Sequence, residues 1–299
     1  MHTYTTYGLR ITSQLELPEF LPSQATEPID VTIRMGKVPL SLPSPKGKGI
    51  LYEANEQQFL LKIDHIARYF VQAGNSITID PRPEALSSDI RVFLLGSCLG
   101  ALLHQRGIFA LHASAINTTH GAVLFTGPSG IGKSTLLNAF LQQGYKMLAD
   151  DIAAIFIAKD QTPMIMPAFP RTKLWEDSAQ ALQIDTATLA RTRPKLKKFE
   201  HYVPQQFEPN PQPIHRIYHL NTRNGASLSL EPIPKMRTVQ TLVLNTYRHQ
   251  FLDGLAMRDT HFQLLTKVAQ HIPIMRVTRP RVPLQLDGLV DMLLTDIHA

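Results

Sequence analysis

The sequence is poor in cysteine and has no long hydrophobic run. A single cysteine, Cys98, excludes an intrachain disulfide. The longest apolar stretch, residues 92–103, is too short to cross a bilayer. The first residues, MHTYTTYGLRIT, lack the basic start and the apolar core of a secretion signal. These absences predict a cytoplasmic chain with no membrane partner.

Signatures of nucleic-acid binding are also absent, although the chain is basic. Lysine and arginine number 30 against 24 aspartates and glutamates, which gives a formal net charge of +6. Such a charge suits an anionic partner, for example ATP, an acidic peptide or a nucleic acid. No zinc finger, RNA-binding signature or basic zipper accompanies the charge, so we expect no nucleic-acid partner.

Two segments of different character follow from the pattern of strands and helices. Residues 30–80 contain short β-rich runs separated by polar turns, a pattern that favours an antiparallel sheet. A helix is predicted from about residue 87 to 106, with Leu95, Leu99 and Leu102 on one face. We therefore expect a β-rich N-terminal segment over residues 1–85 and a second domain over residues 86–299.

The second domain has the element order of an α/β nucleotide-binding core. Strands are predicted at 109–116 and 122–126, followed by a glycine-rich loop, a helix and a strand at 145–149. Because this order is typical of a βαβ unit, we expect the last strand beside the strand that precedes the loop. Farther along, the patterns predict a helix near residues 174–182, strands at 214–220, 226–233 and 274–279, and helices at 239–248 and 259–272.

The glycine-rich loop, GPSGIGKST at residues 127–135, matches the phosphate-binding pattern G-x-x-x-x-G-K-S/T. A backbone folded tightly around an anion aims successive N–H groups at it, and side chains at the glycine positions would obstruct that fold. Lys133 supplies charge for the β- and γ-phosphates, and the hydroxyl of Ser134 can ligate Mg²⁺. The expected fold class is therefore α/β with a P-loop core, and the expected cofactors are ATP and Mg²⁺. The predicted nucleotide-binding residues are Gly127, Ser129, Gly130, Ile131, Gly132, Lys133, Ser134 and Thr135.

Two adjacent carboxylates, Asp150 and Asp151, follow the strand at 145–149. Ligands of open α/β sheets bind at the carboxyl ends of the strands, so these acids are expected close to the phosphates. One carboxylate can hold Mg²⁺ while the other accepts a proton from an attacking hydroxyl. The alternative interpretation of the two aspartates is purely structural: they could form a solvated turn after the strand. His112 lies in the strand ahead of the loop strand, and by itself a histidine at a strand end is more often structural.

Three motifs together resemble the catalytic domain of the HPr kinase/phosphorylase family. They are LHASAI, GPSGIGKST and GYKMLADD, and the resemblance covers roughly residues 110–155. It implies a phosphoenolpyruvate-carboxykinase-like P-loop fold and phosphorylation of a protein serine with Mg-ATP. It also implies that Asp150 is the catalytic base, that Asp151 joins Ser134 in holding Mg²⁺, and that His112 supports an aspartate of this pair.

The chain departs from that family at two places. The N-terminal segment does not resemble the family's regulatory domain, and the family's PGRN segment has only IPKMRTVQ in its place, with Arg237 as a substitute. The layout, including LGALLHQRG, PAFPRTKLWEDS and VLNTYR, is more similar to the HPr-kinase-like proteins of lasso-peptide gene clusters. That resemblance implies a precursor peptide with an acceptor serine as partner.

Charged residues after the acid pair are weaker candidates. Arg171 and Lys173 could contact phosphate or substrate, and Glu176 could join the metal, although Trp175 and these charges could equally form a packed, solvated face. The basic run of Arg191, Arg193, Lys195, Lys197 and Lys198 could dock an acidic peptide. Rival functions are a small-molecule kinase, an HPr protein kinase and a non-catalytic ATP-binding module. A homo-oligomer is among the states that the sequence leaves open.

Overall fold

The chain divides into two compact units. A computed structural model describes residues 1–24, 28–192, 196–225, 227–281 and 285–299. The first unit consists of Met1–Ala110 and Tyr247–Leu264, and the second of Leu111–Thr246 and Leu265–Ala299. In the described parts of the chain, no helix is long and apolar enough to cross a membrane.

The first unit contains a nine-stranded sheet in the order β3-β1-β2-β4-β9-β8-β7-β6-β5. The expected antiparallel arrangement holds only in part, because β4 pairs in parallel with both β2 and β9. No hairpin turn joins β4 to either strand, because β3 comes between β2 and β4 in the sequence, and β5 to β8 come between β4 and β9. The chain can therefore return to the sheet with β4 parallel to both neighbours. The strands are β1 (His2–Thr6), β2 (Leu9–Ser13), β3 (Leu21–Pro22), β4 (Val31–Met35), β5 (Gly47–Lys48), β6 (Tyr52–Asn55), β7 (Gln58–Ile63), β8 (Ala67–Gln72) and β9 (Ser76–Pro81).

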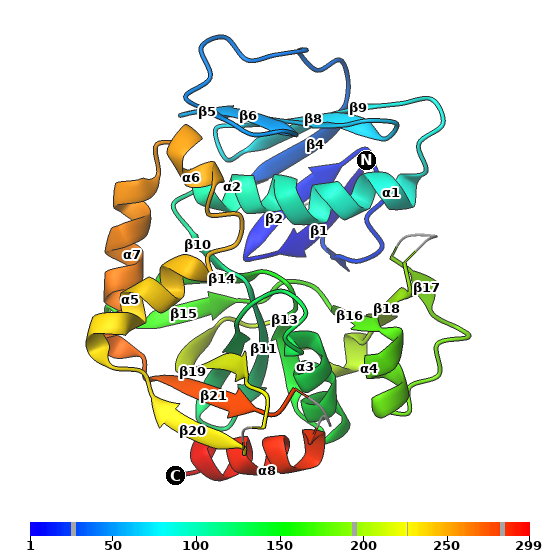
Figure 1. The fold of residues 1–299 in the computed structure, drawn as a ribbon. Coiled ribbons are helices and arrows are strands. Elements are labelled where there is room, and N and C mark those ends of the chain that lie inside the picture. The colour runs from blue at the N-terminus through cyan, green and yellow to red at the C-terminus, as the bar shows by residue number, and fades with distance from the viewer. Residues whose placement is uncertain (25–27, 193–195, 226, 282–284) are drawn as a thin grey trace. The chain divides into compact units, whose positions relative to one another are not determined.

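The predicted helix after this sheet is present as a continuous rod (Figure 1). It comprises α1 (Ser87–Phe93), one π-helical turn (Leu94–Cys98) and α2 (Leu99–Gln105), and it packs on β8. The Tyr69 hydroxyl of β8 donates a hydrogen bond of 3.0 Å to the Ile90 carbonyl. These contacts group the rod with the N-terminal sheet, whereas the sequence places residues from 86 onward with the glycine loop. The short helix α6 (Phe251–Gly254) also belongs to this unit.

The second unit is built on a mixed sheet that contains the path β14-β15-β19-β12-β11-β13. Strand β21 pairs with β19 and with β20. A smaller sheet has the order β16-β18-β17. The strands are β10 (Phe109–Leu111), which begins in the first unit, β11 (Ala113–Thr118), β12 (Gly121–Thr126), β13 (Lys146–Ala149), β14 (Ala153–Ile157), β15 (Pro163–Met166), β16 (Arg171–Trp175), β17 (Ala190–Arg191), β18 (Lys198–Tyr202), β19 (Gln212–Thr222), β20 (Ser229–Pro232) and β21 (Ile274–Arg279).

The expected neighbour of the loop strand is not where the βαβ order suggested. Strand β13 pairs with β11, and β11 lies between β13 and the loop strand β12. The cause is local: a tight turn after Thr118, closed by a 2.7 Å hydrogen bond from its hydroxyl to the Gly121 carbonyl, folds β11 back on β12. Because β11 is antiparallel to both strands, β12 and β13 still run in the same direction. The start of β11 and the ends of β12 and β13 therefore meet at one edge of the sheet.

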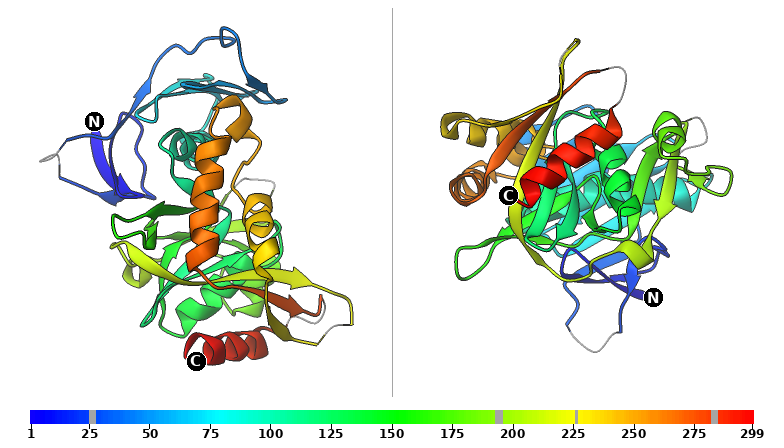
Figure 2. Two further views of the ribbon diagram at one scale, coloured as in Figure 1. Left: turned by 90° about the vertical axis from the view of Figure 1, so that its left-hand side faces the viewer. Right: turned by 90° about the horizontal axis from the view of Figure 1, so that it is seen from below.

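Helices cover this sheet and complete its core. The Phe125 ring of β12 stacks between Phe140 of α3 and Tyr218 of β19. Helix α8 lies against α3 (Figure 2). The helices are α3 (Lys133–Gln142), α4 (Glu176–Ala181), a 3₁₀ turn (Pro204–Gln206), α5 (Lys235–Leu244), α7 (Arg258–His271), which begins in the first unit, and α8 (Leu286–Ile297).

The helix predicted near residues 174–182 is shorter than expected. Residues up to Trp175 form strand β16, and only the residues from Glu176 onward are helical. Strand β16 pairs with β18 over its whole length, so cross-strand hydrogen bonds override the local helical pattern.

Candidate functional site

The glycine-rich loop joins β12 to α3 and has the backbone that phosphate cradles need. Gly127, Gly130 and Gly132 have φ values of 141°, 79° and 103°, a region that other residues rarely adopt. A Cβ atom on Gly127 would lie 2.8 Å from the Leu220 carbonyl oxygen. Glycine is therefore required at the first position of the loop by both conformation and space.

Lys133 is the first residue of α3 and lies inside its own loop. Its side-chain ammonium donates hydrogen bonds of 2.8 Å and 3.1 Å to the carbonyls of Gly127 and Pro128. Burial lowers the pKa of Lys133 to about 8, although the carboxylates of Asp150 and Asp151 oppose that shift. The amine is therefore a partly desolvated charge, held close to where phosphate oxygens would lie.

The carboxylate of Asp150 is buried and accepts three hydrogen bonds. The hydroxyls of Ser134 and Ser114 donate to Oδ1 at 2.9 Å and 2.7 Å. The backbone N–H of Lys173 donates to Oδ2 at 2.9 Å. These contacts fix the carboxylate beside the serine of the loop, as the shared sheet edge predicts.

Asp151 is held between the side chains of Lys173 and His112. Lys173 lies 3.1 Å from Oδ2, and His112 Nδ1 lies 3.3 Å from Oδ1 and 2.9 Å from the Asp151 carbonyl oxygen. Burial opposes ionisation of this carboxyl, but the charges of Lys173 and His112 outweigh it and hold the pKa well below its usual range. The backbone of Asp151 has a φ of 81°, which is strained for a residue other than glycine.

His112 contacts Asp151, the second aspartate of the pair. Its pKa is lowered by burial and by the charge of Lys133, although Asp151 opposes both. Its backbone carbonyl accepts a 3.0 Å hydrogen bond from the Thr126 hydroxyl, which ties it to the end of the loop strand. The histidine is thereby fixed against the second carboxylate of the pair.

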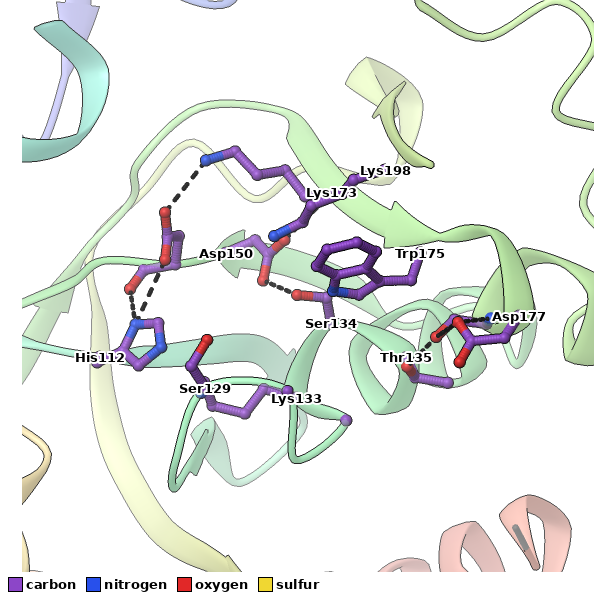
Figure 3. Close-up of a pocket in the computed structure, with 14 residues that line it drawn as sticks. His112, Ser129, Lys133, Ser134, Thr135, Asp150, Lys173, Trp175, Asp177 and Lys198 are labelled. Carbon is purple, nitrogen blue, oxygen red and sulfur yellow. Dashed lines mark hydrogen bonds and ion pairs between the residues drawn. The ribbon is translucent and has the colours of Figure 1, made fainter. Parts of the chain in front are cut away.

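These groups line a single cleft of about 390 Å³. Figure 3 shows His112 at one end, Lys133, Ser134 and Asp150 in the middle, and Thr135 with Asp177 at the other end. The lining residues are His112, Ser129, Gly130, Gly132, Lys133, Ser134, Thr135, Asp150, Asp151, Lys173, Trp175, Asp177, Ser178 and Lys198.

Three of the weaker candidates do not line this cleft. Arg171 is buried and pairs with Glu200 at 3.0 Å. Glu176 pairs with Lys197 at 2.7 Å, and Arg237 lines a different pocket. Lys173 is the exception, because it reaches both aspartates. Of the predicted basic run, Lys198 lines the cleft, while Arg193 and Lys195 lie outside the described residues.

The sequence did not single out Ser114 or Arg279. Ser114 follows His112 by two residues and so shares its face of the chain, a signal that was available. Arg279 ends β21 and donates a 2.9 Å hydrogen bond from Nη2 to the carbonyl of Ile131 in the loop. Its place could be found only from the parallel pairing of β12, β19 and β21.

The donors in the cleft fit a magnesium ion and a polyphosphate. Ser134 Oγ and Asp150 Oδ1 are 2.9 Å apart. Adjacent oxygen ligands around octahedral Mg²⁺ are about 3 Å apart, given metal–oxygen distances of about 2.1 Å. Carboxylate and hydroxyl oxygens are also the hard ligands that this ion prefers.

Comparisons with known proteins do not assign this chain to a family. No protein-family description and no curated protein matches it. Among the solved structures that are similar to it is the HPr(Ser) kinase/phosphatase from Coxiella burnetii, with a TM-score of 0.34 and 13% identity, over 63% of this chain and 92% of that one. A similarity this weak supports no functional conclusion, so the function is inferred from the residues of the site.

Proposed function

We propose that this chain is an ATP- and Mg²⁺-dependent kinase that phosphorylates a serine of a peptide or protein. The observation that carries the proposal is the 2.9 Å contact between Ser134 of the glycine loop and Asp150 of the acid pair, inside one cleft that also contains Lys133. Phosphoryl transfer needs a phosphate cradle, a metal site and a carboxylate for the acceptor, and all three meet there. The motif resemblance favours the precursor of a ribosomally made peptide, such as a lasso peptide, as acceptor.

The acid pair divides the two tasks that the reaction leaves to side chains. Asp150 is proposed to orient the acceptor hydroxyl, since its carboxylate already accepts hydrogen bonds from two hydroxyls. Asp151 stays ionised at neutral pH because its pKa is held down, so it suits a cation better than a proton. His112 positions Asp151. Ser134 and Asp151 would hold Mg²⁺, and Asp150 Oδ1 is close enough to share it.

The transfer itself is an in-line displacement. The acceptor oxygen forms a bond to the γ-phosphorus, the bond between that phosphorus and the bridging oxygen of ADP breaks, and the hydroxyl proton passes to Asp150. The ammonium of Lys133 and the N–H groups of the loop stabilise charge on the phosphate oxygens. The chemistry supplied by Mg²⁺, when bound, is neutralisation of charge on the β- and γ-phosphates.

Mass spectrometry of candidate acceptors tests this function. The protein is incubated with Mg-ATP and either HPr or a lasso-type precursor peptide, and phosphate is expected on serine. The Lys133→Ala variant serves as the negative control. Phosphate on a metabolite with none on polypeptide would identify a small-molecule kinase instead. Tight ATP binding with no transfer to any acceptor would identify a nucleotide-binding module.

A further inference from the structure

A second pocket adjoins the glycine loop on the side of Pro128. Its volume is about 530 Å³. One wall is a single face of α5, because the lining residues of that helix recur every three or four positions. The opposite wall comes from β19 and β21. The lining residues are Pro128, His219, Arg237, Gln240, Thr241, Leu244, Asn245 and Arg276.

The strand register places this pocket at the phosphate edge of the sheet. His219 pairs with Thr126, the last residue before the loop, and Arg276 pairs with His219. Paired residues of neighbouring strands project from the same face of a sheet. The imidazole of His219 and the guanidinium of Arg276 therefore lie side by side. His219 is on β19, the strand next to β12 and the start of the glycine loop, and Arg276 is on β21, one strand farther away.

No acidic side chain lines this pocket, although Glu231 of β20 lies opposite Arg276 in the strand register. Its lining includes two arginines and a histidine. Among the residues that the structure describes, no acidic side chain forms an ion pair with Arg237 or Arg276. His219 Nδ1 is buried, and none of the described residues gives it a hydrogen-bond partner. Two guanidinium groups without an ion pair at one pocket favour an anionic ligand there, because guanidinium binds carboxylate and phosphate oxygens strongly.

We propose that the pocket binds an anionic group of the phosphoryl acceptor, a carboxylate or a phosphate, next to the hydroxyl that is phosphorylated. Arg237 and Arg276 donate to its oxygens, and the His219 side chain lies beside them in the pocket wall. This inference rests on the kinase function proposed above and narrows its substrate to an acidic or already phosphorylated polypeptide segment around the acceptor serine.

The position of the pocket favours the acceptor over the nucleotide. Pro128 of the glycine loop lines the pocket, and burial, Arg276 and Lys133 all lower the pKa of His219, so the pocket lies within electrostatic reach of the lysine proposed to serve the β- and γ-phosphates. The Asn245 carbonyl at the end of its helical wall accepts a 2.8 Å hydrogen bond from the His112 N–H. These contacts place the pocket at the end of the phosphate chain where transfer occurs, whereas Thr135 and Asp177 mark the other end of the cleft (Figure 3).

Nuclear magnetic resonance of isotope-labelled histidine tests the pocket directly. The protein is first saturated with Mg-ADP, so that the glycine loop is filled, and is then titrated with inorganic phosphate or with malonate. A saturable shift of the His219 signal is expected, and the pKa of His219 should rise because the anion offsets the charges of Arg276, Arg237 and Lys133. The His219→Gln variant identifies the signal. A response to phosphate alone or to malonate alone identifies which anion the pocket takes.

Variants of the two arginines separate specific binding from general attraction to a basic protein. Arg276→Gln should weaken anion binding about tenfold or more, since a charge-assisted hydrogen bond is lost. Arg237 is exposed on α5, so Arg237→Gln should act in the same direction without unfolding the protein. The matched control is Arg223→Gln, an exposed arginine outside the pocket, which should leave the affinity unchanged.

Two results would overturn the inference. One is a His219 signal that does not shift saturably with either anion. The other is equal anion affinity in the wild type and in both pocket variants. Failure of Mg-ADP to bind would instead count against the kinase function. In that case the anion titration is repeated on the Lys133→Ala variant, in which the glycine loop no longer binds the added phosphate in competition with the pocket.

Discussion

At the scale of single residues, the site combines a buried lysine with two differently held carboxylates. The ammonium of Lys133 is desolvated, Asp150 is fixed by neutral donors, and Asp151 is fixed by Lys173 and His112. The loop and the acid pair could be recognised in the sequence, because they are contiguous motifs. Of their partners, Lys173 was among the weaker candidates and Ser114 left a signal two residues after His112, whereas no local pattern points to Arg279.

Burial of Lys133 should cost stability at neutral pH. Its pKa is about 8 in the folded chain against an ordinary value of 10.5, so the unfolded chain holds the proton more tightly. The cost is present below pH 8 and is relieved as pH rises from 8 towards 10.5. Lys133→Met should therefore stabilise the protein at pH 7, by at most about 3 kcal/mol, while nucleotide binding is lost. Urea unfolding at several pH values measures this gain, and a gain that does not shrink above pH 8 would contradict the expectation.

The proposed base can be separated from the nucleotide cradle. Asp150→Asn keeps the shape of the side chain but removes its ability to take a proton. The rate of phosphoryl transfer should fall about 10²- to 10⁴-fold, while the affinity for ADP measured without Mg²⁺ changes little. Rapid-quench kinetics and calorimetry measure the two quantities, and a wild-type transfer rate in this variant would remove Asp150 from the role of base.

At the scale of elements, the position of the site follows from the direction of three strands. The sequence indicated strand, loop, helix and strand in the right order, but not the insertion of β11 between β12 and β13, nor the hairpin of β16 with β18. Both depend on hydrogen bonds between backbone segments, whose partners a local pattern does not specify. The acids still reach the loop, because β12 and β13 point to the same edge.

The first glycine of the loop should be the least tolerant of a side chain. Gly127→Ala places Cβ 2.8 Å from the Leu220 carbonyl oxygen at a φ of 141°. Gly130→Ala meets no atom within 4 Å, so it carries only the backbone cost of its φ of 79°. We expect a loss of about 2 kcal/mol or more for the first variant and about 1 kcal/mol for the second. Chemical denaturation of both proteins compares them, and equal losses would contradict the close approach.

The hairpin of β16 and β18 provides an optical reporter of the cleft. Trp175 is the chain's single tryptophan, is 44% exposed and lines the cleft, with Lys198 Nζ 5.4 Å from the centre of its ring. Binding of Mg-ADP should change its fluorescence intensity or emission wavelength, because both its solvent exposure and the nearby charge change. The change should be saturable in the wild type and absent in Lys133→Ala. An unchanged spectrum at saturating nucleotide, verified by calorimetry, would place the ligand away from this hairpin.

At the scale of the whole molecule, the chain passes from the first compact unit to the second, returns to the first and ends in the second. The first unit uses Tyr247–Leu264 as well as the N-terminal residues, so no single cut in the sequence separates the two. Composition and motifs did not reveal this return, because the returning segment carries no distinctive pattern of its own.

A fragment that starts at residue 86 should therefore fold poorly. It keeps α1 and α2 but lacks β8, against which the rod packs, and so exposes side chains such as Leu94, Leu99 and Leu102 that are fully buried in the intact chain. Exposure of such side chains favours aggregation. The soluble yield and the melting temperature of the fragment should both be lower than those of the full chain. A fragment as soluble and as stable as the full chain would support the boundary at residue 86 that the sequence favours.

The resting position of Lys133 has a consequence for affinity. Two of the three N–H donors of the ammonium are directed to carbonyl oxygens of its own loop. One donor therefore remains for a phosphate oxygen, and any further phosphate contact would replace a contact with the loop. Nucleotide affinity should accordingly depend on how firmly the carbonyls of Gly127 and Pro128 hold the lysine.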